Sequence, residues 1–163
     1  MSKMLVSDII KEKLIKNGGS AKVKSLQGKI YEITFNPNDK HIVCDNLPPV
    51  FTYEVFDIII NLLEEQNGKA KKGSARNFKL GEKGCEETTV AGTILKNYFG
   101  KSNGESGLDP VFILSSILEW AGIVHNKRGY LELTEEYKNN KTLWKIREFY
   151  YFQNIIKHQD KPF

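Results

Sequence analysis

Three stretches of the chain carry apolar side chains at helical spacing, and each is followed by a glycine. Residues 53–66, 86–99 and 109–121 place apolar side chains three or four positions apart, which is typical of a buried helical face. The glycines that follow favour the left-handed backbone conformation that ends helices. They are Gly68, Gly100 and Gly122. Asp109 and Pro110 suit the start of the third helix. The chain is therefore expected to build its core mainly from three helices.

Two predicted β-hairpins flank these helices. Residues 29–35 alternate polar and apolar side chains, and residues 41–44 form a second apolar stretch beyond a turn rich in Asn, Pro and Asp. Near the other end, the polar stretch 125–129 separates residues 123–124 from residues 130–134 and has the composition of a tight hairpin loop. The expected fold class is therefore α+β, mostly helical.

The two ends of the chain add further helical patterns. Residues 5–16 form a short amphipathic helix, Thr134 begins another, and residues 143–157 predict an aromatic-rich helix that packs against the body. The pattern divides the chain into residues 1–50, with the N-terminal helix and hairpin, and residues 51–163. The first part either belongs to the same core or forms a small subdomain.

The order of elements resembles a winged-helix domain over about residues 52–134. A basic segment follows the first of the three helices, and a hairpin through residues 126–129 follows the third. The most recognisable stretch is the end of the third helix, residues 117–124, leading into residues 129–134. The resemblance is to the superfamily. It implies a third helix in the DNA major groove and a wing that touches phosphates or the minor groove.

The predicted third helix departs from that pattern in its polar residues. Between Pro110 and Ala121 the only polar side chains are Ser115, Ser116 and Glu119. The helix therefore has no Lys, Arg, Asn or Gln to donate hydrogen bonds to base edges. Contacts with DNA are expected to be to its phosphate backbone, and such contacts position a protein rather than specify a sequence.

The basic excess of the chain lies in one segment. Residues 68–83 hold six basic side chains against Glu82 alone, a net of +5, so the remaining residues carry −1 of the total of +4. Lys127 and Arg128 add a second basic cluster at the hairpin tip. The alternative interpretations are a solvated basic loop and a hairpin tip that is polar like most others. The predicted nucleic-acid-binding residues are Lys69, Lys71, Lys72, Arg76, Lys79, Lys83, Lys127 and Arg128.

No residue pattern predicts a catalytic, cofactor or metal site. Gly100-Lys101-Ser102 resembles the end of a phosphate-binding loop, but the position five residues before Gly100 is Leu95 and a helix precedes it. The three histidines are far apart in the sequence and lack acidic or thiol residues at ligand spacing. A metal-dependent nuclease would need Asp109 and Glu136 to converge on one site.

The main hypothesis is a DNA-binding protein that is not an enzyme. The alternative is a protein–protein interaction module, in which the C-terminal helix forms a homodimer, and the third is a metal-dependent nuclease or a fragment of one. No apolar run is long enough to span a bilayer, and Cys44 and Cys85 lie in no paired motif. These features predict a cytoplasmic protein without a membrane partner.

Overall fold

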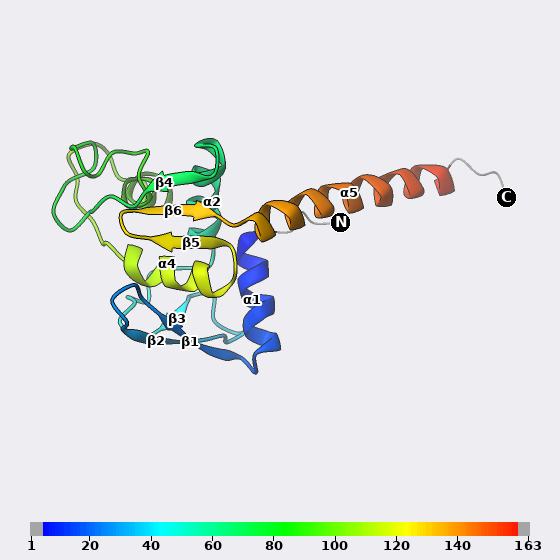
Figure 1. The fold of residues 1–163 in the computed structure, drawn as a ribbon, viewed down its shortest axis with the longest axis horizontal. Helices are drawn as coiled ribbons and strands as arrows, with labels where there is room; N and C mark the ends of the chain where they lie inside the picture. The colour runs from blue at the N-terminus through cyan, green and yellow to red at the C-terminus, as the bar shows by residue number, and fades with distance from the viewer. Residues whose placement is uncertain (1–4, 160–163) are drawn as a thin grey trace.

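The computed structural model describes residues 5–159 of the 163-residue chain and has the α+β fold that the sequence predicts (Figure 1). Helix α4 lies between two small antiparallel sheets, and the longest helix, α5, extends away from them. The elements in chain order are α1 (Val6–Lys16), β1 (Ser20–Lys24), β2 (Ile30–Thr34), β3 (Val43–Cys44), α2 (Glu54–Glu65), β4 (Lys69–Lys71), α3 (Val90–Thr93), the π-helical turn η1 (Ile94–Tyr98), α4 (Val111–Trp120), β5 (Val124–Lys127), β6 (Tyr130–Leu133) and α5 (Glu135–Gln159).

The N-terminal sheet consists of β1, β2 and β3, in that order. The predicted hairpin is confirmed, because β2 pairs with β3. The periodicity missed β1, which pairs with β2 from Ser20↔Thr34 to Lys24↔Ile30. Two glycines with positive φ, Gly18 and Gly19, turn the chain from α1 into this strand. Strand β1 has few apolar side chains and so gave a weak signal.

The C-terminal sheet has the order β4-β6-β5. The predicted second hairpin is confirmed as β5 and β6, which pair from Val124↔Leu133 to Lys127↔Tyr130. Part of the basic segment is the strand β4, which adds to the free edge of β6. Two segments that are far apart in the sequence, β4 just after α2 and the β5–β6 hairpin, are therefore joined in one sheet.

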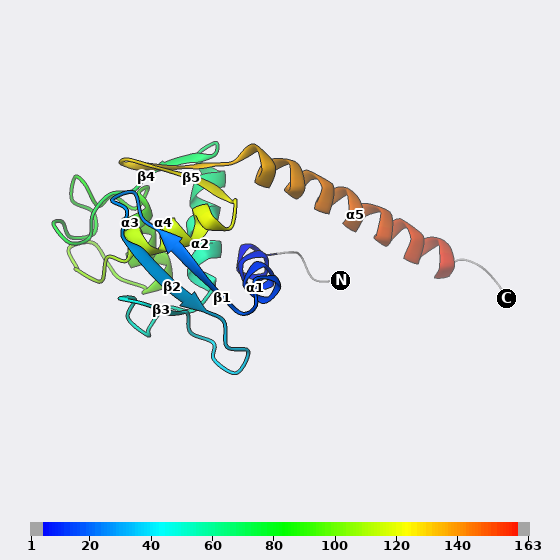
Figure 2. The ribbon, with the colours of Figure 1, turned by 60° about the horizontal axis from the view of Figure 1, so that its bottom comes forward.

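Helix α4 is almost entirely buried. Every residue from 113 to 118 is buried, including Ser115 and Ser116, which are each 1% exposed. The N-terminal sheet lies on one side of the helix and the C-terminal sheet on the other (Figure 2). Residues 1–50 and 51–163 therefore share one buried cluster, which runs from Ile10 and Ile33 to Leu63 and Leu131.

The helix predicted over residues 86–99 begins four residues later than its pattern suggested. The hydroxyl of Thr89 accepts a hydrogen bond from Gly92 N at 3.0 Å and so caps α3. A Cβ on Gly92 would lie 1.8 Å from the carbonyl oxygen of Glu86, so only glycine fits this turn. At the end of η1, the rings of Tyr98 and Phe99 pack on Phe51, at 5.6 and 5.4 Å between centroids.

The prediction that the aromatic C-terminal helix packs against the body is wrong. Residues 135–159 form one continuous helix, α5, whose first turns contact the body through Tyr137 and Trp144. The helix then projects outward (Figure 1). Its later apolar side chains are 45–64% exposed, because no other part of the described chain reaches them. These are Leu143, Ile146, Phe149, Tyr150 and Phe152.

Candidate nucleic-acid interface

The outer face of the C-terminal sheet is rich in lysine. Side chains alternate between the two faces of a strand, and Ala70, Asn126 and Leu131 point inward and are buried. Their neighbours therefore point outward. Together with Arg128 in the β5–β6 turn, they form what we term the basic sheet face. Its residues are Lys69, Lys71, His125, Lys127, Arg128, Tyr130 and Glu132.

Strand register places side chains of the basic sheet face next to one another. Lys71 pairs with Tyr130, and Tyr130 pairs with Lys127, so the three form one row across the sheet. Side chains in such rows have Cβ atoms about 5 Å apart between adjacent strands. The ammonium of Lys69 lies 4.0 Å from the centre of the Tyr130 ring. Glu132 is the only acidic residue on this face.

A hydrogen bond ties the basic segment to the tip of the hairpin. Lys72 N donates to Gly129 O at 2.8 Å, and Lys72 O accepts from Ala91 N at 2.9 Å. The backbone of residue 72 thus links the β5–β6 turn to the start of α3. The structure brings Lys69, Lys71, Lys127 and Arg128 together on one surface.

The side chain of Lys72 differs from the other predicted site residues. It is 8% exposed, and burial lowers the pKa of its ammonium, while the nearby Glu119 carboxylate acts in the opposite direction. The seven other predicted residues are exposed. Lys72 therefore has little surface to offer a phosphate.

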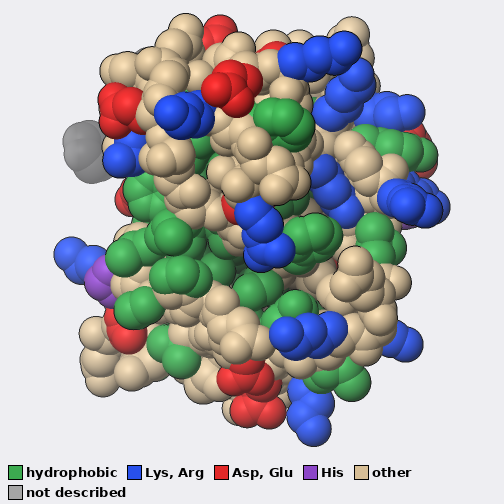
Figure 3. Space-filling view, turned by 90° about the vertical axis from the view of Figure 1, so that its left-hand side faces the viewer, with side chains coloured by type: hydrophobic (Ala, Val, Ile, Leu, Met, Phe, Trp, Pro, Cys, Tyr) green, Lys and Arg blue, Asp and Glu red, His purple; other side chains and the backbone are tan. Residues whose placement is uncertain are grey.

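The remaining basic residues lie in the long loop between β4 and α3. The loop is anchored by Ala75, Leu80 and Cys85, which are at most 5% exposed. Leu80 N donates to Glu105 O at 3.0 Å, which joins this loop to the one between η1 and α4. Both loops and the β5–β6 turn lie at the same end of the molecule (Figure 1). Figure 3 views this end, where Lys and Arg side chains gather mainly toward the upper right.

Arg76 lies beside the start of α4. The carboxylate of Asp109 accepts hydrogen bonds from the backbone N–H groups of Ala75 and Arg76, at 3.0 and 3.3 Å. Its other oxygen accepts from Val111 N at 3.3 Å. The prediction that Asp109 caps α4 is wrong, because Pro110 is the N-cap residue and Asp109 precedes it. The Asp109 carboxylate instead joins the loop that carries Arg76 to the start of α4.

The covered position of α4 leaves it no free face for a DNA groove. Among its side chains, only Phe112 and Glu119 are exposed, and Glu119 Oε2 accepts a hydrogen bond from Asn126 N at 3.0 Å. The sequence indicated that α4 lacks donors for base edges. The sequence did not indicate that α4 is covered, because β1, which packs against this helix, was not recognised as a strand.

The acidic residues considered for metal chemistry do not meet. Asp109 precedes α4, whereas Glu136 lies near Gly122, beyond the opposite end of that helix. A helix of this length separates its ends by about 15 Å. Within residues 5–159 no group of three or more His, Cys, Asp or Glu side chains is arranged to hold a metal ion.

No helix in the described part of the chain is long and apolar enough to cross a membrane. No family model matches the sequence, and neither the curated proteins nor the solved structures contain a significant match to it.

Proposed function

We propose that this protein binds DNA by contacting the phosphate backbone through the basic sheet face. The observation that carries the proposal is the cluster of Lys69, Lys71, Lys127 and Arg128 on one surface with a single acidic neighbour. These cations come from two segments more than fifty residues apart in the sequence, and the sheet register holds them together.

The order of elements supports a winged-helix-like arrangement for this interface. Helix α2 is followed by β4, then by α3, α4 and the β5–β6 hairpin, which is the order on which the sequence resemblance rests. The hairpin corresponds to the wing, and its tip carries Lys127 and Arg128. Because α4 is covered, the wing and β4 replace the third helix as the DNA-contacting elements. In this proposal the protein acts in the cytoplasm, a reducing compartment that suits the free thiols of Cys44 and Cys85.

The proposed contacts are electrostatic and do not read base sequence. Each neutralised phosphate releases condensed counterions, so log Kobs falls with log salt with a slope of about −0.9 per contact. Lys79 and Lys83 extend the positive surface onto the adjacent loop, and Arg76 extends it toward α4. We therefore expect binding that is steeply salt-dependent and similar for duplexes of different sequence.

The test is binding of a labelled random-sequence duplex at salt concentrations from about 50 to 200 mM, by fluorescence anisotropy. Lys71→Glu/Lys127→Glu is expected to weaken binding by on the order of tenfold to a hundredfold at low salt and to flatten the salt dependence. Both side chains are exposed, so the substitutions leave the core intact.

The matched control is Lys22→Glu/Lys24→Glu, which makes the same change in charge on the outer face of the N-terminal sheet. It is expected to change duplex affinity less than twofold beyond the general effect of net charge. Equal losses in the two variants would show that net charge alone drives binding. No binding by the wild type at low salt would rule out the proposed function.

A second candidate function is self-association through α5. The specific observation is the set of exposed apolar side chains between Leu143 and Phe152 on a helix that projects from the body. Isolated helices are only marginally stable in water and gain stability mainly from packing. This candidate predicts a concentration-dependent dimer in sedimentation experiments that Phe149→Glu/Phe152→Glu converts to a monomer.

A further inference from the structure

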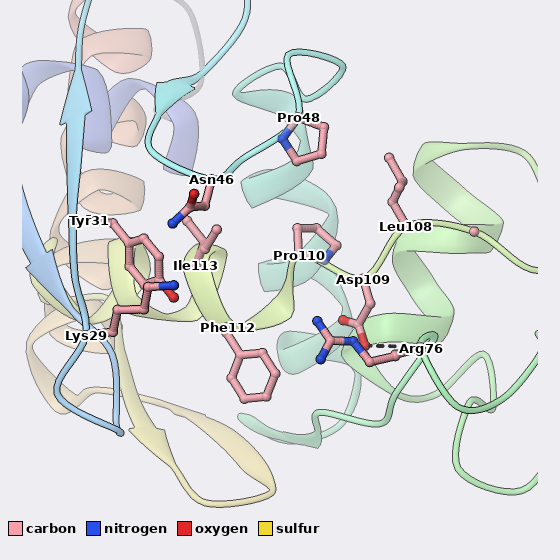
Figure 4. A pocket seen from close by; sticks show the side chains of 11 residues that line it. Lys29, Tyr31, Asn46, Pro48, Arg76, Leu108, Asp109, Pro110, Phe112 and Ile113 are labelled. Carbon is pink, nitrogen blue, oxygen red and sulfur yellow. Dashed lines mark hydrogen bonds between the residues drawn. The ribbon is translucent and has the colours of Figure 1, made fainter.

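A pocket of about 440 Å³ lies where the N-terminal sheet, the loop before α2 and the first turn of α4 meet (Figure 4). This volume is within the range of sites that bind small organic ligands. The side chains that matter for the inference come from four separate segments of the chain. They are Lys29, Tyr31, Asn46, Arg76, Phe112 and Ile113.

The floor and rim of the pocket are apolar and partly aromatic. Tyr31 and Ile113 are 8% and 7% exposed, so the buried floor is already packed against the core. Phe112, by contrast, is 52% exposed, although it stands at the start of a helix whose other apolar residues are buried or, in the case of Trp120, partly buried. A half-exposed phenyl ring beside an apolar floor offers a stacking surface to a planar ligand.

Two cationic side chains lie on opposite sides of this floor. Lys29 stands beside Tyr31, with its ammonium 5.4 Å from the ring centre, and Arg76 approaches from the loop after β4 (Figure 4). Among the ion pairs of the described residues, none includes Lys29 or Arg76. Asp109 also lines the pocket, and its carboxylate, which lies beside the Arg76 side chain in Figure 4, accepts three backbone hydrogen bonds.

The pocket also contains a side-chain amide. Asn46 has a φ of 61°, a left-handed conformation that asparagine tolerates better than most residues, and its side chain points toward Tyr31 and Ile113. An amide can both donate and accept hydrogen bonds, as the polar edge of a nucleobase requires. The pocket thus combines a stacking surface, an amide and a cation on either side.

We propose that this pocket binds one unpaired nucleotide of a single-stranded nucleic acid. A nucleotide within a strand has a planar base and a phosphate on each side of its sugar, which matches an aromatic surface flanked by two cations. The base stacks on Phe112 near Asn46, and the adjoining phosphates lie near Lys29 and Arg76. The pocket lies outside the basic sheet face, so this proposal goes beyond the duplex binding proposed above.

The first test is binding of a short fluorescein-labelled oligo-dT strand. Because stacking on one aromatic ring accounts for much of the affinity per base, Phe112→Ala is expected to weaken binding roughly five- to tenfold and to leave duplex binding unchanged. The control is Ile15→Ala, which shortens an apolar side chain of similar exposure on α1 (58% against 52% for Phe112) and is expected to have no effect. Unchanged oligo-dT binding by Phe112→Ala, with its thermal unfolding also unchanged, would overturn the proposal.

The second test identifies the residues that the strand contacts and asks whether a single nucleotide is sufficient for binding. A strand with a single 5-iodouracil should photocrosslink to Phe112 or Tyr31. Crosslinks confined to Tyr130 would place the strand on the basic sheet face and overturn the proposal. Thymidine 3′,5′-bisphosphate should compete with oligo-dT if one nucleotide provides most of the contacts. Lys71→Glu/Lys127→Glu should still bind oligo-dT at the pocket, so a failure of duplex binding and a failure of the pocket give different results.

Discussion

The two sheets of this protein have the same architecture but different outer faces. Each has three antiparallel strands, and each buries one face against the core on either side of α4. On the outer face of the N-terminal sheet, Lys22 pairs with Glu32, and Ile30 and Val43 are exposed apolar residues. The outer face of the C-terminal sheet instead has three lysines and the adjoining Arg128 against one acidic residue, whereas that of the N-terminal sheet has Lys22 and Lys24. The inner faces must be apolar because they are buried, whereas the residues of the outer faces are free to vary. Differences in function are therefore expected on the outer faces.

The largest expected effect is on the free energy of unfolding, and it tests whether the inner faces of the two sheets contribute equally to stability. Ile33 of the N-terminal sheet and Leu131 of the C-terminal sheet are both fully buried. Ile33→Ala and Leu131→Ala should each lower the free energy of unfolding by about 2 to 5 kcal/mol, because each leaves a cavity in the shared core. Urea denaturation measures the loss.

The shape of the transition sharpens this first comparison. If both sheets belong to one cooperative unit, far-UV circular dichroism and tryptophan fluorescence should report a single transition with the same midpoint in each variant. Two separate transitions in Ile33→Ala would instead show that residues 1–50 unfold as an independent subdomain.

A smaller effect concerns Lys72, the buried lysine that directly follows β4 of the C-terminal sheet. Burial lowers the pKa of Lys72, so below that native pKa the charged ammonium destabilises the fold. Between the lowered value and the ordinary 10.5, the unfolded chain binds more protons than the native one, and stability rises with pH. Lys72→Met should lack this rise.

The measurement for Lys72 is the difference between variant and wild type in the urea midpoint from pH 7 to about 9.5. The variant should be as stable as the wild type or more so near pH 7, and this advantage should shrink at the alkaline end. Lys71→Met is the control, because it makes the same substitution at the adjacent, exposed position. A difference that does not depend on pH would contradict the assigned cause.

The sequence predicted the parts of this fold that have strong periodicity. The ranges predicted for α2 and α4 agree with the structure within two residues at either end, and both hairpins are present. Strand β1 could not be recognised, because Ala21 and Val23 are its only apolar side chains and its pairing with β2 is a tertiary feature. The missed strand covers one side of α4, so the burial of that side was not predictable from the residues of the helix.

The candidate interface was predictable in composition but not in geometry. The density of lysine in residues 68–83 identified the segment, but only strand pairing distinguishes exposed Lys71 from buried Lys72 next to it. The pocket beside Phe112 gave no local signal, because its residues come from four segments that meet only in the folded chain. Apolar spacing likewise could not show that the aromatic residues of α5 extend beyond the body.

The smallest expected effect concerns two cation–π contacts between a lysine and a tyrosine, one at each sheet. The ammonium of Lys69 lies 4.0 Å from the Tyr130 ring centre, and that of Lys29 lies 5.4 Å from the Tyr31 ring centre. An exposed cation–π contact is worth about 0.5 to 1 kcal/mol and weakens with distance. Lys69→Gln should therefore lower the free energy of unfolding by about 0.5 kcal/mol, and Lys29→Gln by less, as measured by urea denaturation.

If Lys69→Gln leaves stability unchanged but still weakens duplex binding, the ring of Tyr130 does not stabilise the sheet, and the contribution of Lys69 is its charge beside Lys71. Equal destabilisation by the two variants would mean that the shorter contact adds nothing to the stability of the C-terminal sheet.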